Sequence, residues 1–270
     1  AHQIRILALL RSLAHGCRMA VAVVTHDLNL AAEFGRQGLT VLVVDLDPQA
    51  NASLHIGKQH PSEVAVTCAE LLGAEMEKLP LAVHEETQLE GVSLIYGSLA
   101  LGRTEDDLKD TAPRPSEELR AKLAPLEGVF DVILIDCPPS LKLLTSNALA
   151  AATDVIIPVE SGSQYGMYGV SDLLRHIEKI RRINPRLNVL GALLIRHDER
   201  QMVCKFIESS AREQIGNILP IRIPTSTKVN QAAIAQTSLH SLDRSAKISR
   251  EFRDLAHHVA GLLELPLQKG

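Results

Sequence analysis

Three carboxylates follow two short apolar segments and are the residues of this sequence best placed to do chemistry. Asp45 and Asp47 come after residues 40–44 (TVLVV), and Asp136 comes after residues 130–135 (FDVILI). In open α/β folds ligands bind where the parallel strands end, so these acids are expected to meet at one edge of a sheet. Carboxylates in that place can hold Mg²⁺ and a water beside a phosphate. An aspartate at a strand end can also simply cap the next turn.

The segments that must position these acids alternate between strand and helix patterns. Strands are expected at residues 19–24, 40–44, 92–96, 130–135, 155–159 and 189–195. Helices are expected at residues 28–36, 64–72, 117–126, 170–183, 203–215 and 245–263, with a polar surface loop at residues 103–115. This alternation predicts an α/β fold, a doubly wound and mainly parallel sheet with helices on both faces. Residues 1–18 are expected to form an N-terminal helical extension, and residues 19–270 a single domain.

The composition excludes some classes of protein. The net charge of −4 excludes a chain that is basic overall, although a local basic patch remains open. Aromatic residues make up 3% and Trp is absent, which argues against aromatic platforms that stack on bases. The four cysteines are scattered without a CxxC pair, which is typical of reduced thiols in a cytoplasmic protein. No apolar run approaches the roughly 20 residues of a membrane-spanning helix.

Four segments, in order along the chain, resemble the ParA/Soj partition ATPases of the MinD/ParA superfamily. They are residues 41–53 (VLVVDLDPQANAS), 131–160 (DVILIDCPPSLKLLTSNALAAATDVIIPVE), 165–194 (YGMYGVSDLLRHIEKIRRINPRLNVLGALL) and 219–233 (LPIRIPTSTKVNQAA). The resemblance implies a P-loop NTPase-like, nucleotide-binding domain that takes ATP or ADP with Mg²⁺. It also implies a nucleotide-sandwich homodimer, nonspecific DNA binding at the nucleoid, and hydrolysis stimulated by a ParB-like partner to segregate a plasmid, chromosome or other cargo.

The resemblance assigns roles to the acids at the phosphate end of the site. Asp47 matches the hydrolytic aspartate that orients the water attacking the γ-phosphate, and Asp136 matches the Walker B acid that holds Mg²⁺. Asp45 precedes Asp47 by two residues, so both could address one Mg²⁺–water shell, because residues i and i+2 of a strand face the same side. Gln49 is grouped with Asp45 among the nucleotide contacts.

At the other end, Pro224 and Thr225 match the loop that lies against the adenine, and Arg196 falls beside it. Arg196 could stack on the base or be solvated. The candidate DNA contacts are basic residues of the C-terminal third, of which two, Arg200 and Lys228, match basic positions of the family: Arg200, Lys205, Lys228, Arg244 and Lys247. Phosphate contacts of this kind would make binding fall steeply with salt. An ordinary solvated surface is the alternative for each of them.

The resemblance breaks at the phosphate loop. The family carries the deviant Walker A motif KGGVGKTT between its first strand and first helix, but here Val24 is followed directly by THDLNLAAEFGRQG, and residues 19–34 contain neither Gly nor Lys. A phosphate loop needs glycines whose backbone N–H groups wrap the phosphates and a lysine that neutralises them. Either the printed sequence omits residues between Val24 and Thr25, or the chain has lost the loop. We favour omission, because the flanks match the family on both sides.

These two interpretations predict different functions. With a loop, the chain is a ParA-type ATP hydrolase; without one, it is a pseudo-ATPase that acts as a scaffold or interaction module. A MinD-like membrane-associated ATPase is a third possibility, which the last helix tests. Its polar face includes Glu251 and Asp254 rather than a row of lysines and arginines, so we expect no membrane binding.

Overall fold

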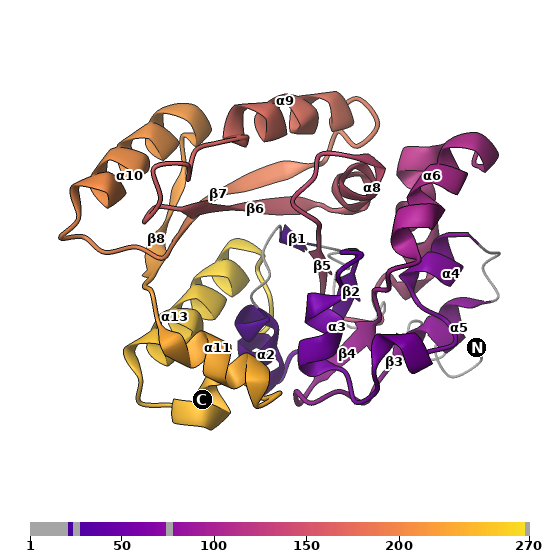
Figure 1. Ribbon diagram of the computed structural model, residues 1–270, viewed down its shortest axis with the longest axis horizontal. Coiled ribbons are helices and arrows are strands. Elements are labelled where there is room, and N and C mark those ends of the chain that lie inside the picture. Colours follow the sequence, from indigo (N-terminus) through magenta and orange to yellow (C-terminus); the bar gives the residue numbers. More distant parts are fainter. Residues whose placement is uncertain (1–20, 24–27, 74–77, 268–270) are drawn as a thin grey trace.

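The computed structural model describes residues 21–23, 28–73 and 78–267, and its centre is one eight-stranded sheet (Figure 1). The strands are β1 (Val21–Val23), β2 (Val41–Asp45), β3 (Val83–His84), β4 (Val92–Ile95), β5 (Val132–Asp136), β6 (Asp154–Glu160), β7 (Asn188–Ile195) and β8 (Ile218–Ile223). Their order in the sheet is β3-β4-β2-β5-β1-β6-β7-β8, and only β3 runs antiparallel to its neighbour. The expected doubly wound, mainly parallel sheet is therefore confirmed.

Helices cover both faces of this sheet. They are α2 (Asn29–Arg36), α3 (Asn51–Ile56), α4 (Cys68–Leu72), α5 (Leu79–Ala82), α6 (Leu101–Thr111), α7 (Glu118–Leu123), α8 (Leu143–Ala151), α9 (Val170–Ile180), α10 (Met202–Ile215), α11 (Thr227–Ile234), α12 (Leu239–Asp243) and α13 (Lys247–Leu262). One apolar cluster packs α2, α3 and α13 against one face, and two further clusters pack α4, α6, α7, α8, α9 and α10 against the other. Burial on both faces explains why the first four residues of β2 are all apolar. The last residue of the strand, Asp45, is a buried acid.

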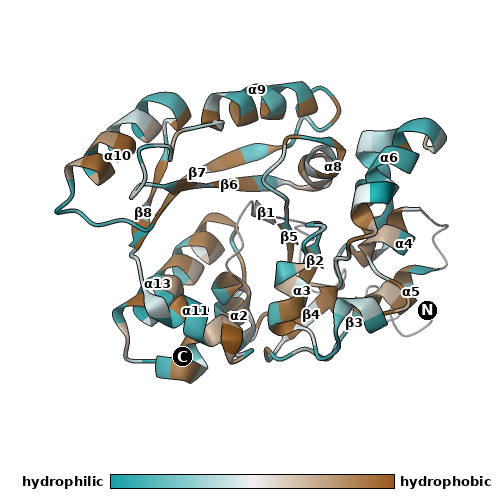
Figure 2. Ribbon diagram, in the orientation of Figure 1, coloured by the Kyte–Doolittle hydropathy of each residue, from teal (hydrophilic) through white to brown (hydrophobic). Residues whose placement is uncertain are grey.

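The prediction of a surface loop at residues 103–115 is wrong, because most of this segment forms α6. Leu101, Glu105 and Leu108 recur at helical spacing and are buried, while the remaining acidic residues face outward. Figure 2 shows α6 as largely hydrophilic, which is why its narrow apolar stripe is hard to recognise in the sequence. The helix predicted at residues 64–72 is shorter than expected, because Thr67 and Glu70 form a capping box that starts α4 at Cys68.

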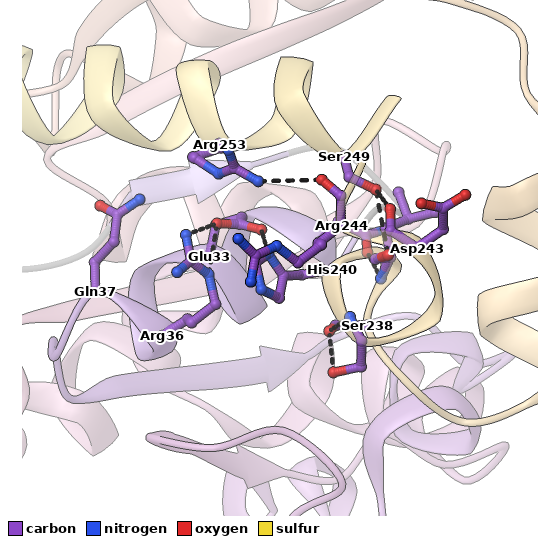
Figure 3. A network of polar contacts seen from close by, with 12 residues as sticks. Glu33, Arg36, Gln37, Ser238, His240, Asp243, Arg244, Ser249 and Arg253 are labelled. Carbon is purple, nitrogen blue, oxygen red and sulfur yellow. Dashed lines mark hydrogen bonds and ion pairs between the residues drawn. The ribbon is translucent and has the colours of Figure 1, made fainter. Parts of the chain in front are cut away.

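A polar network anchors α2 to the C-terminal helices (Figure 3). Glu33 is buried, and its Oε2 accepts hydrogen bonds from Arg36 Nε at 3.1 Å and Nη2 at 2.9 Å. Its Oε1 lies 3.7 Å from His240 Nδ1 on α12. Asn29 Oδ1 accepts the backbone N–H of Leu239 at 3.0 Å. The first helix after β1 is thus held by polar contacts as well as by the apolar cluster.

Two predictions concern parts of the chain that this structure does not describe. The N-terminal helix of residues 1–18 and the phosphate loop between Val24 and Thr25 both lie outside the described residues. Within the described ranges, the structure contains no helix that is both long enough and apolar enough to cross a membrane.

Candidate functional site

The pairing of the central strands brings two of the three acids to neighbouring positions. β2 and β5 pair in parallel with Asp45 opposite Asp136, the last residue of each strand. On its other side Asp136 pairs with Val23 of β1. We call the edge at which the parallel strands end the carboxyl edge. The acids therefore meet at this edge beside β1, as the sequence predicts.

Asp45 is the centre of a buried hydrogen-bond network. Its Oδ2 accepts the Ser53 backbone N–H at 2.8 Å and the Ser53 hydroxyl at 2.7 Å, and its Oδ1 accepts the Asp47 backbone N–H at 3.1 Å. Ser53 Oγ also accepts the Gly97 N–H at 2.8 Å. A Cβ at Gly97 would lie 2.8 Å from the Asp45 carboxylate, so only glycine fits there. The network joins the end of β2 to the start of α3 and the end of β4.

Burial raises the pKa of Asp45 to about 6, and the hydrogen bonds from Ser53 and Asp47 oppose this rise. Asp45 has no exposed surface and accepts three hydrogen bonds, one of them from the backbone of Asp47, so it ties down the loop that carries Asp47. Its coordination of Mg²⁺ stays a prediction. The sequence analysis missed Ser53 and Gly97, since nothing in the local pattern shows that β4 ends beside β2.

Asp47 lies at the carboxyl edge in a tight turn. Its Oδ1 accepts the Gln49 N–H at 3.0 Å, and its backbone carbonyl accepts the Ala50 N–H at 2.9 Å. Ala50 has a positive φ of 52°, which ends this turn and starts α3. The Asp47 side chain is buried at the start of the turn, whereas Gln49 is exposed. The turn thus orients one carboxylate oxygen of Asp47 by a backbone bond; the hydrolytic role of Asp47 and the nucleotide contact of Gln49 stay predictions.

Asp136 differs from the other two acids because its carboxylate accepts no hydrogen bond from the part of the chain that the structure describes. Both carboxylate oxygens are buried, and neither has a hydrogen-bond partner among the residues that the structure describes. Burial, with the charges of Asp45 and Asp47, raises the pKa of Asp136 well above its usual range. A buried carboxylate without partners is stabilised by a cation. Asp136 therefore fits a Mg²⁺ ligand, although the described residues contain no cluster of three or more His, Cys, Asp and Glu that could hold a metal by itself.

The opposite half of the carboxyl edge holds the residues predicted to contact the base. β7 and β8 end side by side at Ile195 and Ile223, and the His197 N–H donates to the Ile223 carbonyl at 3.0 Å. Arg196 follows β7 and Pro224 and Thr225 follow β8, so the chain leaves the sheet at neighbouring positions where these residues begin. Arg196 has a positive φ of 51°, and its exposed guanidinium forms an ion pair with Glu160 at 2.9 Å. Pro224 is half-buried and Thr225 exposed.

β1 lies between these two halves. It separates β5, which ends in Asp136, from β6, β7 and β8, which end near Arg196 and Pro224. The acids and the predicted base contacts thus lie on opposite sides of the first strand, an arrangement that the sequence order alone does not reveal.

The candidate DNA contacts are spread over several elements. Arg200 follows β7 and Lys205 lies on α10, whereas Lys228 lies on α11, Arg244 directly follows α12 and Lys247 starts α13 (Figure 1). Helices α10 and α13 pack on opposite faces of the sheet. Arg200 forms a bidentate ion pair with Asp198, in which both N–O distances are 2.9 Å, and Lys228 forms an ion pair with Asp243. Lys205, Arg244 and Lys247 are exposed. DNA binding by these residues stays a prediction.

Comparison with known proteins places this geometry in a family. The profile of an AAA domain family, AAA_31, matches residues 18–189. The chromosome partitioning protein ParA of Caulobacter vibrioides is 30% identical over 263 residues, covering 96% of this chain and 95% of that protein. The chromosome-partitioning ATPase Soj of Thermus thermophilus is 33% identical over 241 residues, covering 88% of this chain and 90% of that protein.

A solved structure extends the likeness to the whole fold. Cobyrinic acid a,c-diamide synthase from Mycobacterium smegmatis, with a bound ATP analogue and magnesium, superimposes with a TM-score of 0.77 at 29% identity, covering 93% of this chain and 99% of that one. With its parallel sheet, its paired acids at the carboxyl edge and these relatives along nearly its full length, the chain belongs to the ParA/Soj family of partition ATPases.

Proposed function

We propose that this chain is a ParA-type ATP hydrolase that binds ATP and Mg²⁺ at the carboxyl edge of its sheet. It would form a nucleotide-sandwich homodimer, bind DNA nonspecifically at the nucleoid, and hydrolyse ATP when a ParB-like partner stimulates it. Its cargo would be a plasmid, a chromosome region or another large body. The observation that carries the proposal is the pair Asp45 and Asp136 in register beside β1, with the Asp136 carboxylate buried and without a hydrogen-bond donor among the described residues.

Each acid has a distinct part in this reaction. Asp136 would hold the Mg²⁺, which supplies neutralisation of phosphate charge when bound. Asp47 would orient the attacking water, because its carboxylate lies on a turn held by the Asp45 network. Asp45, with both oxygens engaged by N–H and O–H donors, would keep that turn in place. Catalysis would therefore rest on positioning and charge neutralisation, without a covalent intermediate.

The M. smegmatis structure supports the ligand assignment, since it holds an ATP analogue and magnesium on a fold of this kind. The phosphate loop is the missing part. No glycine or lysine occurs in residues 19–34, and this feature favours the second candidate, a loop-less pseudo-ATPase that acts as a scaffold. The intact mass of the purified protein separates the two, because an omitted loop would add several hundred daltons to the 29.4 kDa of this sequence.

The decisive experiment measures binding of Mg²⁺–ATP by calorimetry and ATP turnover in the presence of DNA. The ATPase proposal predicts that Asp47→Ala abolishes turnover while ATP binding persists. Glu199→Ala is the matched control, because it removes an exposed carboxylate after β7 that has no proposed role, and it should retain parental turnover. Equal turnover in Asp47→Ala and the parent would reject the role of Asp47. A protein of 29.4 kDa that takes up no adenine nucleotide would instead establish the pseudo-ATPase.

A further inference from the structure

A chain of polar side chains, buried at Ser161 and His197 and partly buried at Glu208 and Arg222, links the three strands that end beside the predicted base contacts. Ser161 follows β6, His197 follows β7, Glu208 lies on α10 and Arg222 lies in β8. We call these four residues the His197 cluster. Ser161 Oγ lies 2.9 Å from His197 Nδ1, and His197 Nε2 lies 3.9 Å from Glu208 Oε2. Arg222 Nη2 donates to Glu208 Oε1 at 2.6 Å. The cluster thus crosses from β6 to β8 through the imidazole.

The imidazole in this cluster is enclosed. Ser161 has no exposed surface and His197 is 6% exposed. Burial lowers the pKa of His197, which favours the neutral ring, while the hydrogen bond from Arg222 lowers the pKa of Glu208 and keeps that acid charged. Ser161 is too deeply buried to reach any substrate, so the arrangement of serine, histidine and acid does not form a nucleophilic site. The His197 cluster can therefore affect a ligand only through the backbone segments that it holds in place.

That backbone is the loop that carries Arg196. The Ser161 N–H and hydroxyl reach the Ile195 carbonyl at 3.0 Å and 3.2 Å, and the His197 N–H donates to the Ile223 carbonyl at 3.0 Å. Arg196, between Ile195 and His197, is held at a positive φ of 51°. A non-glycine residue in this conformation costs about 1 kcal/mol or more and persists only where its surroundings impose it.

Close packing of the preceding loop adds to this constraint. A Cβ at Gly162 would lie 2.8 Å from the Arg196 carbonyl oxygen, so the chain after β6 passes directly over the Arg196 peptide. The side chain of Arg196 is exposed and turned towards Glu160, to which it is ion-paired. The loops after β6, β7 and β8 are therefore held together by the cluster, and Arg196 and Pro224 are the residues that they present at the carboxyl edge.

We propose that His197 is a positioning residue for the base of the bound nucleotide, because it joins the ends of β6, β7 and β8 and holds Arg196 beside Pro224. This inference rests on the proposed nucleotide site. It adds that affinity for the base depends on the His197 cluster, whereas affinity for the phosphates depends on the acids across β1. His197 itself touches no ligand in this scheme.

The chain offers a matched control for this proposal. Ser146 Oγ lies 3.0 Å from His176 Nε2, which gives a second serine–histidine contact, 0.1 Å longer than the first, between α8 and α9. Burial lowers the pKa of His176 as well. His176 lies on a helix that packs on one face of the sheet, and it joins no strand ends. Replacing His176 with a nonpolar ring should therefore leave the loops at the carboxyl edge unchanged.

The test compares three variants with the parent in calorimetric titrations of Mg²⁺–ATP and in competition by Mg²⁺–tripolyphosphate, which has no base. His197→Phe keeps a ring but loses both polar contacts, and should raise the Kd for ATP about tenfold, the equivalent of 1.4 kcal/mol, without changing the Kd for tripolyphosphate. His197→Asn should restore most of the ATP affinity, because its amide can replace Nδ1 towards Ser161. His176→Phe should bind both ligands as the parent does.

Two outcomes would overturn the inference: parental ATP affinity in His197→Phe, or an equal loss of affinity for ATP and tripolyphosphate. A parent that binds no ATP refutes the proposed function separately. The inference is then judged on hydrogen exchange of the ligand-free protein. His197→Phe should speed exchange in residues 160–169, 195–200 and 223–227, and His176→Phe should not. If the parent, His197→Phe and His176→Phe exchange these segments at the same rate, the positioning role of His197 is overturned as well.

Discussion

Removal of a single hydroxyl group tests the network that holds the Asp47 turn. In Ser53→Ala, Asp45 loses a hydrogen bond of 2.7 Å, and the buried Gly97 N–H loses its acceptor at 2.8 Å. A hydrogen bond to a charged group contributes about 1.5–3 kcal/mol, and a stranded buried donor costs about 1–3 kcal/mol. We therefore expect the free energy of unfolding to fall by about 3 kcal/mol at pH 8.

The effect of Ser53→Ala should depend on pH. The folded-state pKa of Asp45, about 6, is above its ordinary value of 3.8, so ionisation of Asp45 reduces stability as the pH rises through 6. The Ser53 hydroxyl lessens this penalty by stabilising the charged form. Each further unit by which the variant raises the pKa of Asp45 would cost about 1.4 kcal/mol more above that pKa. The destabilisation should thus be larger at pH 8 than at pH 5.

Urea unfolding followed by circular dichroism at both pH values measures this effect. Ser93→Ala is the control, because Ser93 is a buried serine of β4 whose side chain makes no hydrogen bond among the described residues. A loss in Ser53→Ala that is no larger than the loss in Ser93→Ala, or one that is larger at pH 5 than at pH 8, would refute the assignment of Asp45 as a buried charge held by Ser53.

Four other substitutions have defined outcomes. Asp136→Asn should stabilise the ligand-free protein by roughly 2 kcal/mol at pH 8, because it removes a buried charge that has no partner among the described residues. The gain in stability should shrink as the pH falls and Asp136 takes up a proton, and urea unfolding that shows a loss of stability at both pH 5 and pH 8 would contradict this. Glu105→Ala should lower the free energy of unfolding by about 2 kcal/mol in the same assay, since the buried Glu105 carboxylate accepts the Leu144 N–H in the first turn of α8. An unchanged unfolding midpoint would exclude that cap. Lys247→Glu and Lys205→Glu should each weaken retention of the protein on DNA at low salt. If either variant is retained as strongly as the parent, the face of the sheet that carries that lysine does not contact DNA.

The fold class could be predicted because buried parallel strands leave a strong local signal. β2 is buried along its whole length and β6 is buried at most positions, so both are short continuous apolar runs between helices. β8 was not recognised as a strand, since Pro220 and Arg222 interrupt its apolar residues. A sheet edge tolerates both residues, because one side of the strand needs no hydrogen-bond partner. α6 was missed for the opposite reason, a polar helix whose buried stripe is narrow.

The sequence by itself determined which acids would follow the strands and that Asp45 and Asp136 would meet, because parallel strands all end at one edge. It also determined the family, through motifs spread along the chain in order. Only the tertiary structure decided how the carboxylates differ: Asp45 accepts hydrogen bonds from Ser53 of α3, whereas Asp136 accepts none from the described residues. The His197 cluster likewise depends on the order of strands in the sheet. Hydrogen bonds are short and directional, so such partners become visible only when the chain is folded.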